Sequence, residues 1–269
     1  MTPELLSDVR TALPSGRLIT SDEGDGEAHI LWLSDGPTTA DLWVRLHVEH
    51  THTGLWPLLL DPSDPHDDKF GPWGTGEFFP ERMSSPDAHS PAELLEHWWK
   101  DYTAVDEDDM LSPDDRLAVT APFGQLWPGF TPSPPPAADP EATAADLAQR
   151  FVAGQPHSRL GLVAAGSGAH ALTAVGWDGP TNYDNDTAKF SAVVADWERR
   201  FAARVVVVGP AALHLSIASP PTTTEDALLV AAEHFAFCPD NVWQGHRPYT
   251  LAAYADRIVG CRDWHFWWD

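Results

Sequence analysis

The hydrophobic pattern is most regular after residue 158. Apolar residues recur with the 3.6-residue period of a helix between 186 and 201, and capping signals at Ser167 and Thr222 favour two more helices. Two short apolar segments, 204–209 and 213–219, are separated by a Gly-Pro turn and predict a β-hairpin. The pattern further predicts strands at 159–165 and 264–269 and a helix at 251–259.

The pattern before residue 128 is less regular. Ser90 and Pro91 supply an N-cap and a first-turn proline ahead of an apolar stripe, which predicts a helix. Another helix is expected to open near Thr38, and strands are expected at 28–34 and 55–61. Because Pro57 has no backbone N–H, it favours an edge strand or a bulge for the second of these.

A proline-rich segment divides the chain. The sequence TPSPPPAA at 131–138 is stiff and extended, so it cannot enter a helix interior or a central strand. We therefore expect a smaller, acidic N-terminal α+β domain at 1–127, a Pro-rich linker at 128–141 and a C-terminal domain at 142–269. The order of elements after the linker favours an α+β fold with an antiparallel sheet, arranged as a ferredoxin-like split βαβ unit with extra helices.

Several C-terminal segments carry a resemblance to a known family. They are RLGLVAA (159–165), GWDGP (176–180), WERRFAARVVVVG (197–209), LHLSIASPP (213–221), AEHFAFCPDNVWQG (232–245) and WHFWWD (264–269). These segments resemble a bacterial family catalogued as domain-of-unknown-function 4253, and the likeness spans most of residues 158–269. Upstream, GLWPLLLD and GEFFPERMSSPDAH look like the N-terminal part that longer members carry. The resemblance implies a fold unit and transfers no activity, cofactor or catalytic residue.

The chain is strongly acidic. It has 16 Lys and Arg against 40 Asp and Glu, a formal net charge of -24, and 25 of the acidic residues lie in the first 130 positions. Residues 101–115 contain seven acidic and no basic side chains, among them Asp106, Glu107, Asp108 and Asp109. Such a run repels phosphate, which argues against nucleic acid and anionic membranes as partners.

The charge instead favours a basic protein partner. Acidic surfaces accelerate association with basic proteins, so we expect a protein-binding factor of an immunity-like or regulatory kind, with Asp106, Glu107, Asp108 and Asp109 in contact with the partner. The plainer interpretation is a solvated loop that keeps an acidic protein soluble.

The N-terminal sequence and the cysteine content bear on the compartment. The segment MTPELLSDVR lacks the basic and apolar regions of a secretory signal, and two cysteines cannot make a disulfide framework. No apolar run reaches the roughly 18 residues of a membrane-spanning helix. We therefore expect a cytoplasmic protein.

The segment after the helix that the Thr222 capping signal predicts gathers polar groups beside a tryptophan. His234, Asp240, Asn241, Trp243 and Gln244 form the kind of set that lines a small-ligand cleft, with few polar groups on an apolar wall. They are the candidate ligand-binding residues of an enzyme or a small-molecule-binding protein that uses a cleft between the two halves. The alternative is a turn in which the polar side chains cap the backbone and the indole fills the core.

Two histidine-containing groups bear on metal binding. His234, Cys238, Cys261 and His265 could complete a tetrahedral zinc shell, but the usual Cys-x-x-Cys knuckle is absent. The string HVEHTH at 47–52 lacks the His-Glu-x-x-His spacing of a zinc protease and favours the solvent-facing end of an amphipathic helix. The phosphate-loop, dinucleotide and hydrolase-elbow motifs are also absent. The sequence therefore predicts no metal and no cofactor.

Overall fold

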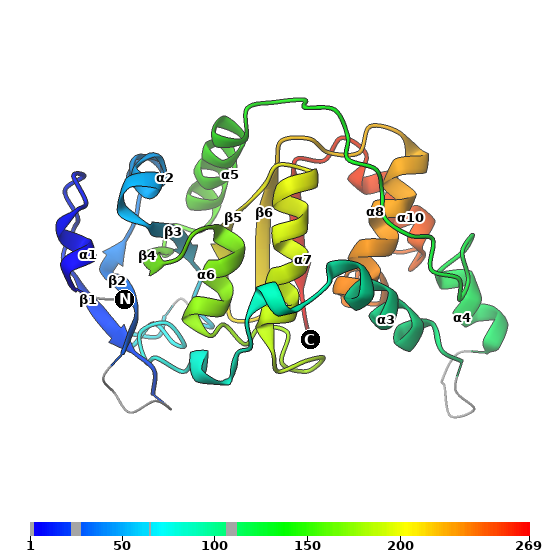
Figure 1. Ribbon diagram of the computed structural model, residues 1–269, viewed down its shortest axis with the longest axis horizontal. Helices are drawn as coiled ribbons and strands as arrows, with labels where there is room; N and C mark the ends of the chain where they lie inside the picture. Colours follow the sequence, from blue (N-terminus) through cyan, green and yellow to red (C-terminus); the bar gives the residue numbers. More distant parts are fainter. Residues whose placement is uncertain (1–2, 23–27, 65, 106–111) are drawn as a thin grey trace.

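The strands of both halves of the chain form one seven-stranded sheet in the computed structural model, which describes residues 3–22, 28–64, 66–105 and 112–269 (Figure 1). The strand order is β1-β2-β4-β3-β5-β6-β7, and every neighbouring pair is antiparallel except β3 and β5. The strands are β1 (Gly16–Thr20), β2 (His29–Pro37), β3 (Leu55–Leu60), β4 (Arg159–Ala164), β5 (Ala203–Val208), β6 (Ala212–Ile217) and β7 (Asp263–Trp267). The helices are α1 (Pro3–Ser7), α2 (Ala40–Thr53), α3 (Pro91–Thr103), α4 (Pro113–Val119), α5 (Pro140–Gly154), α6 (Gly168–Val175), α7 (Thr187–Arg200), α8 (Thr224–Phe237), α9 (Asp240–Trp243) and α10 (Leu251–Ile258), with 3₁₀ turns η1 (Pro80–Arg82) and η2 (Pro86–Ala88).

This single sheet corrects the expectation of two separate domains, one of them ferredoxin-like. Strand β3, from the first half, lies between β4 and β5 of the second half. Because β3 is antiparallel to β4 and parallel to β5, β4 and β5 run in opposite directions. A split βαβ unit needs those two strands to be parallel. The protein is therefore an α+β fold with one mixed sheet that runs through the whole chain.

Helices cover both faces of the sheet. On one face, α2 and α5 pack against alternate side chains of β3 and β4, including Leu59 and Leu162. On the other face, α6 and α7 pack against the opposite set, which includes Leu58 and Val163. Helices α3, α8 and α10 lie beyond α7, toward the end of the sheet that β7 forms (Figure 1). The alternation of inward positions along each strand thus produces three layers.

A proline occupies the centre of the sheet, although the sequence favoured an edge or a bulge there. Pro57 pairs with Leu162 of β4, whereas only the last two residues of β3 pair with β5 in the ladder. The ladder on the β5 side therefore needs no N–H from Pro57. In its place the Trp56 indole Nε1 donates to the Val205 carbonyl at 3.0 Å, and the Trp43 indole donates to the Pro57 carbonyl at 3.0 Å.

The proline-rich segment is packed against the second half of the chain. The Thr131 N–H donates to the Glu233 carboxylate at 2.9 Å, and Arg200 donates to the Thr131 carbonyl at 3.0 Å. Asp139 then caps α5, a helix that the sequence pattern did not indicate. Within the described residues, no helix is both long and apolar enough to span a membrane.

Candidate functional site

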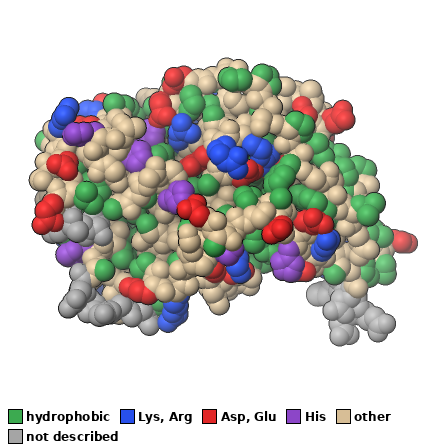
Figure 2. All heavy atoms as spheres, in the orientation of Figure 1, with side chains coloured by type: hydrophobic (Ala, Val, Ile, Leu, Met, Phe, Trp, Pro, Cys, Tyr) green, Lys and Arg blue, Asp and Glu red, His purple; other side chains and the backbone are tan. Residues whose placement is uncertain are grey.

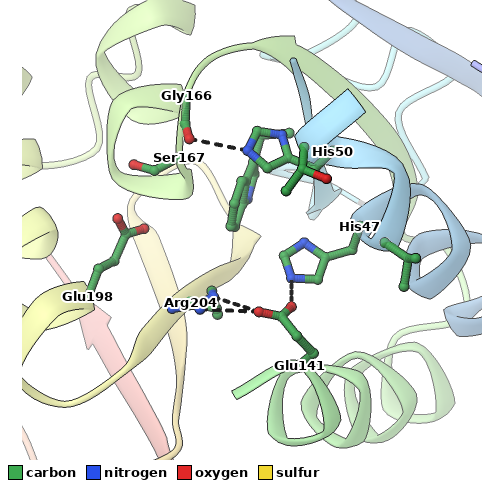
Figure 3. A pocket seen from close by; sticks show the side chains of 10 residues that line it. His47, His50, Glu141, Gly166, Ser167, Glu198 and Arg204 are labelled. Carbon is green, nitrogen blue, oxygen red and sulfur yellow. Dashed lines mark hydrogen bonds and ion pairs between the residues drawn. The ribbon is translucent and has the colours of Figure 1, made fainter. Parts of the chain in front are cut away.

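A pocket of about 540 Å³ lies at one end of the sheet, where β3 and β5 begin and β4 ends. Helices from both faces meet here, because α2 leads into β3 and α6 follows β4. Small-molecule sites are commonly clefts of this kind, where several packed elements meet. The pocket is lined by His47, Val48, His50, Thr51, Trp56, Glu141, Gly166, Ser167, Glu198 and Arg204. Figure 3 shows these side chains converging from α2, α5, α7, β5 and the loop before α6.

One wall of the pocket is an ionic group that joins three elements. His47 of α2 directs its Nε2 at the Glu141 carboxylate of α5, with which it is in close contact (Figure 3). Arg204 of β5 donates through Nε and Nη2 to the other Glu141 oxygen at 3.2 and 3.1 Å. The hydrogen bond from His47 and the charge of Arg204 lower the pKa of Glu141 to about 2. Glu141 is therefore an ionised carboxylate over the physiological pH range.

Aromatic contacts fix both pocket histidines. The His47 ring stacks on Trp43 with 4.7 Å between centroids, and its edge meets Trp56 at 4.8 Å. His50 meets the same Trp56 ring at 4.7 Å, and its Nε2 donates to the Gly166 carbonyl at 3.2 Å. Because a carbonyl only accepts, His50 carries its hydrogen on Nε2. The imidazoles are thus positioned by packing as well as by their polar partners.

The opposite wall is built around the first turn of α6. Ser167 caps this helix and accepts from the His170 N–H, and its hydroxyl also lies 3.0 Å from His170 Nδ1. The Ala169 N–H donates to the Glu198 carboxylate of α7 at 3.0 Å. Burial raises the pKa of Glu198, although the Ala169 and Ser167 hydrogen bonds oppose this shift. Glu198 and Glu141 therefore face one pocket with unequal tendencies to be ionised.

A glycine makes the close packing below this wall possible. A Cβ on Gly168 would lie 2.7 Å from the Val205 Cβ and 2.8 Å from the Trp56 ring. Only glycine lets the start of α6 approach β3 and β5 this closely. Gly166, two residues earlier, has open space around its Cβ position and lies at the exposed rim.

Comparison with known proteins identifies one part of the chain. Residues 159–269 match the family model described as a domain of unknown function, DUF4253. Residues 159–269 form a DUF4253 domain. No match was found among curated proteins or among solved structures.

The DUF4253 domain supplies only part of the sheet and of the pocket. It contains β4, β5, β6 and β7, but the strand between β4 and β5 is β3, from outside the matched residues. In the pocket, Ser167, Glu198 and Arg204 come from the DUF4253 domain, whereas His47 and Glu141 precede it. The residues upstream of the DUF4253 domain therefore complete both the sheet and the pocket.

Three of the ligand-binding residues predicted from the sequence lie together outside the pocket described above. Asp240, Asn241 and Gln244 line a second pocket of about 340 Å³, beside β7. Asp240 accepts from the Tyr183 hydroxyl at 2.8 Å, and Asn241 donates to the His265 carbonyl at 2.8 Å. These side chains satisfy backbone and core groups next to the outer edge of β7, which is how proteins cover an exposed sheet edge.

The other two predicted residues do not line that pocket. His234 is fully buried, and its Nδ1 lies 2.9 Å from the Tyr254 hydroxyl. Burial, with Arg200 nearby, lowers the pKa of His234 well below its usual value, so the ring is neutral. Trp243 packs instead against Phe235 and Tyr102.

The cysteine and histidine residues weighed as zinc ligands have other contacts. Cys238 Sγ lies 3.0 Å from the Trp267 carbonyl, Cys261 Sγ lies 3.0 Å from the Asp263 carbonyl, and His265 stacks on His214. Across the described part of the chain, no group of three or more His, Cys, Asp or Glu residues is arranged to hold a metal. Asp106, Glu107, Asp108 and Asp109, the expected partner-binding residues, lie outside the described residues.

The sequence pattern favours a solvent-facing helix end for His47, but the structure buries this side chain. The sequence does contain a signal for this burial: His47 follows Trp43 by four positions, so both side chains lie on the same face of the helix. Glu141 had no such signal, since it was placed in the linker. Its role depends on His47 and Arg204, which are distant in sequence.

Proposed function

We propose that this protein binds a small polar molecule in the pocket at the end of the sheet. The observation that carries this proposal is the convergence of two glutamates, two histidines and an arginine on one cavity of about 540 Å³. Ligand pockets usually have this size and combine an aromatic wall with a few oriented polar groups. Like the alternative drawn from the sequence, this site combines residues of both halves of the chain, but none of the residues predicted for that alternative line it.

Gly166 provides the test of this proposal. Its Cβ position is open and its side of the loop is exposed, so Gly166→Trp is expected to fill the pocket mouth without an internal clash. A matched control is Gly154→Trp, at an exposed position with equally open space at the end of α5. The measurement is thermal unfolding with a library of polar metabolites, because a ligand that binds the folded state raises Tm.

We expect a compound that raises the Tm of the wild type and of Gly154→Trp but not of Gly166→Trp. A Tm shift that survives in Gly166→Trp would place the binding elsewhere. A polar library in which no compound raises the Tm would argue against a small-molecule function.

The net charge favours a second candidate function, the binding of a basic protein. Acidic side chains are spread over the face shown in Figure 2, with Lys and Arg among them, and the whole chain carries -24. An excess of this size accelerates association with basic surfaces and is screened by salt. Asp106, Glu107, Asp108 and Asp109 are the proposed contact residues.

Native mass spectrometry of the protein from its own host, at low and then at high salt, tests this candidate. We expect a basic partner that dissociates at high salt and is absent when the four acidic residues are replaced by their amides. A complex that is insensitive to both changes would contradict the electrostatic proposal.

A further inference from the structure

The hydrogen-bonding groups of the pocket at the end of the sheet are unequally satisfied. Most of the nitrogen donors already have protein acceptors: His47 Nε2 lies against the Glu141 carboxylate, His50 donates to the Gly166 carbonyl, and Arg204 donates to Glu141 and to the Ala203 carbonyl at 2.8 Å. His47 Nδ1 and His50 Nδ1 have no hydrogen-bond partner, and on a neutral ring with its hydrogen on Nε2 this nitrogen is an acceptor. The Trp56 indole donates to the Val205 carbonyl. A ligand therefore meets few donors on this lining that are not already engaged.

The acceptors of the pocket are in surplus. The Glu198 carboxylate accepts from the Ala169 N–H and from Ser167, and two carboxylate oxygens offer about four lone-pair sites. The rim adds Glu141, which is about half exposed, and the Thr51 hydroxyl. A ligand that fits this lining must bring donors of its own.

The charges show the same imbalance. Glu141 has Arg204 and His47 as partners, whereas no ion pair involves Glu198 among the residues that the structure describes. The charged and titratable groups that face Glu198 are Arg204 from β5 and His170 from α6, and burial still raises its pKa. Glu198 is partly buried, and a partly buried carboxylate without a paired cation gains from a ligand that supplies one.

We propose that the ligand of this pocket is a small organic amine whose ammonium group donates to Glu198. An ammonium group brings three donors and no acceptor, which complements a lining with free acceptors and engaged donors. The overall charge of -24 raises the local concentration of such cations. This inference rests on the proposed small-molecule function and specifies its ligand class.

The test uses three probes of one size and different charge: cyclohexylamine, cyclohexanol and cyclohexanecarboxylate. Ligand-observed NMR titration gives the Kd of each with wild type, with Glu198→Gln and with Glu225→Gln. Glu225→Gln is the control, because it removes a charge from an exposed position of α8 that is not part of the pocket lining. Gly166→Trp shows whether a probe that binds does so in the pocket.

We expect cyclohexylamine to bind about 10-fold or more tightly than cyclohexanol, with the preference lost in Glu198→Gln and kept in Glu225→Gln. Equal binding of all three probes, or a preference that survives in Glu198→Gln, would overturn the amine assignment. Library compounds of another class that lose binding in Gly166→Trp would overturn it too, while leaving the small-molecule function intact. If no probe and no library compound binds the pocket, both proposals fail.

Discussion

Glu233→Ala should be among the most destabilising single substitutions in this chain. Glu233 is fully buried on α8, and its two carboxylate oxygens accept from the Thr131 N–H at 2.9 Å, the Trp197 indole at 2.9 Å and the Arg200 guanidinium. The substitution leaves two neutral donors and one cation without these acceptors. It also frees the proline-rich segment from α8, because Thr131 is the residue that Glu233 holds.

The magnitude follows from these contacts. An unsatisfied buried donor costs about 1–3 kcal/mol, and breaking a buried ion pair from one side costs about 3–5 kcal/mol. These costs do not add in full, because Asp196 still pairs with Arg200 at 2.6 Å. We therefore expect the free energy of unfolding to fall by about 3–5 kcal/mol, a large part of the roughly 5–15 kcal/mol of a typical domain.

Urea unfolding followed by tryptophan fluorescence measures this change. Asp256→Ala, at an exposed position of α10, is the control and should change the free energy of unfolding by less than about 0.5 kcal/mol. Hydrogen exchange at the Thr131 amide should become faster in Glu233→Ala than in the control. A loss of less than about 1 kcal/mol, with the Thr131 amide still protected, would refute the claim that this network holds the segment.

Three further predictions concern packing and pH. Gly168→Ala should lower the free energy of unfolding by about 1–3 kcal/mol, because its Cβ would lie within 3 Å of Val205 and Trp56; unchanged urea stability would contradict the tight packing. The contacts of Glu141 lower its pKa from the ordinary 4.5 to about 2. The ionised carboxylate therefore stabilises the fold in full at pH values above about 4.5, and this stabilisation is lost as the pH falls toward 2. The stability difference between wild type and Glu141→Gln should therefore shrink over that range, and a pH-independent difference would count against the His47 and Arg204 contacts. His234 has a lowered pKa and is neutral when folded, so the unfolded chain binds more protons and wild-type stability falls as the pH drops below about 6.5. His234→Phe should remove that part of the slope, which urea unfolding at several pH values would show.

Many local elements of this fold follow from local chemistry and are predicted from the sequence, although the pattern does not indicate β1 or α5. Ser90 and Ser167 cap α3 and α6 as expected, because a cap depends only on the three or four residues that follow it. Strand pairing is different, since it depends on contacts between distant segments. Nothing in the pattern of 55–61 indicates that this strand separates β4 from β5, and Pro57 argued against a central place. The Trp56 and Trp43 indoles, which replace the missing ladder contacts, act only once the sheet has formed.

The same dependence on distant contacts explains why the pocket could not be predicted. Sequence reasoning recognised the Ser167 cap, but Glu198 gains its role only because α7 brings it to the first turn of α6. His47 and Glu141 lie upstream of the DUF4253 domain and meet Arg204 only because β3 is inserted between β4 and β5. A strand that joins two others in this way places the end of α2 and the start of α6 at the same edge of the sheet. The pocket is therefore a consequence of the insertion of β3, so its chemistry belongs to the two halves together and not to the DUF4253 domain alone.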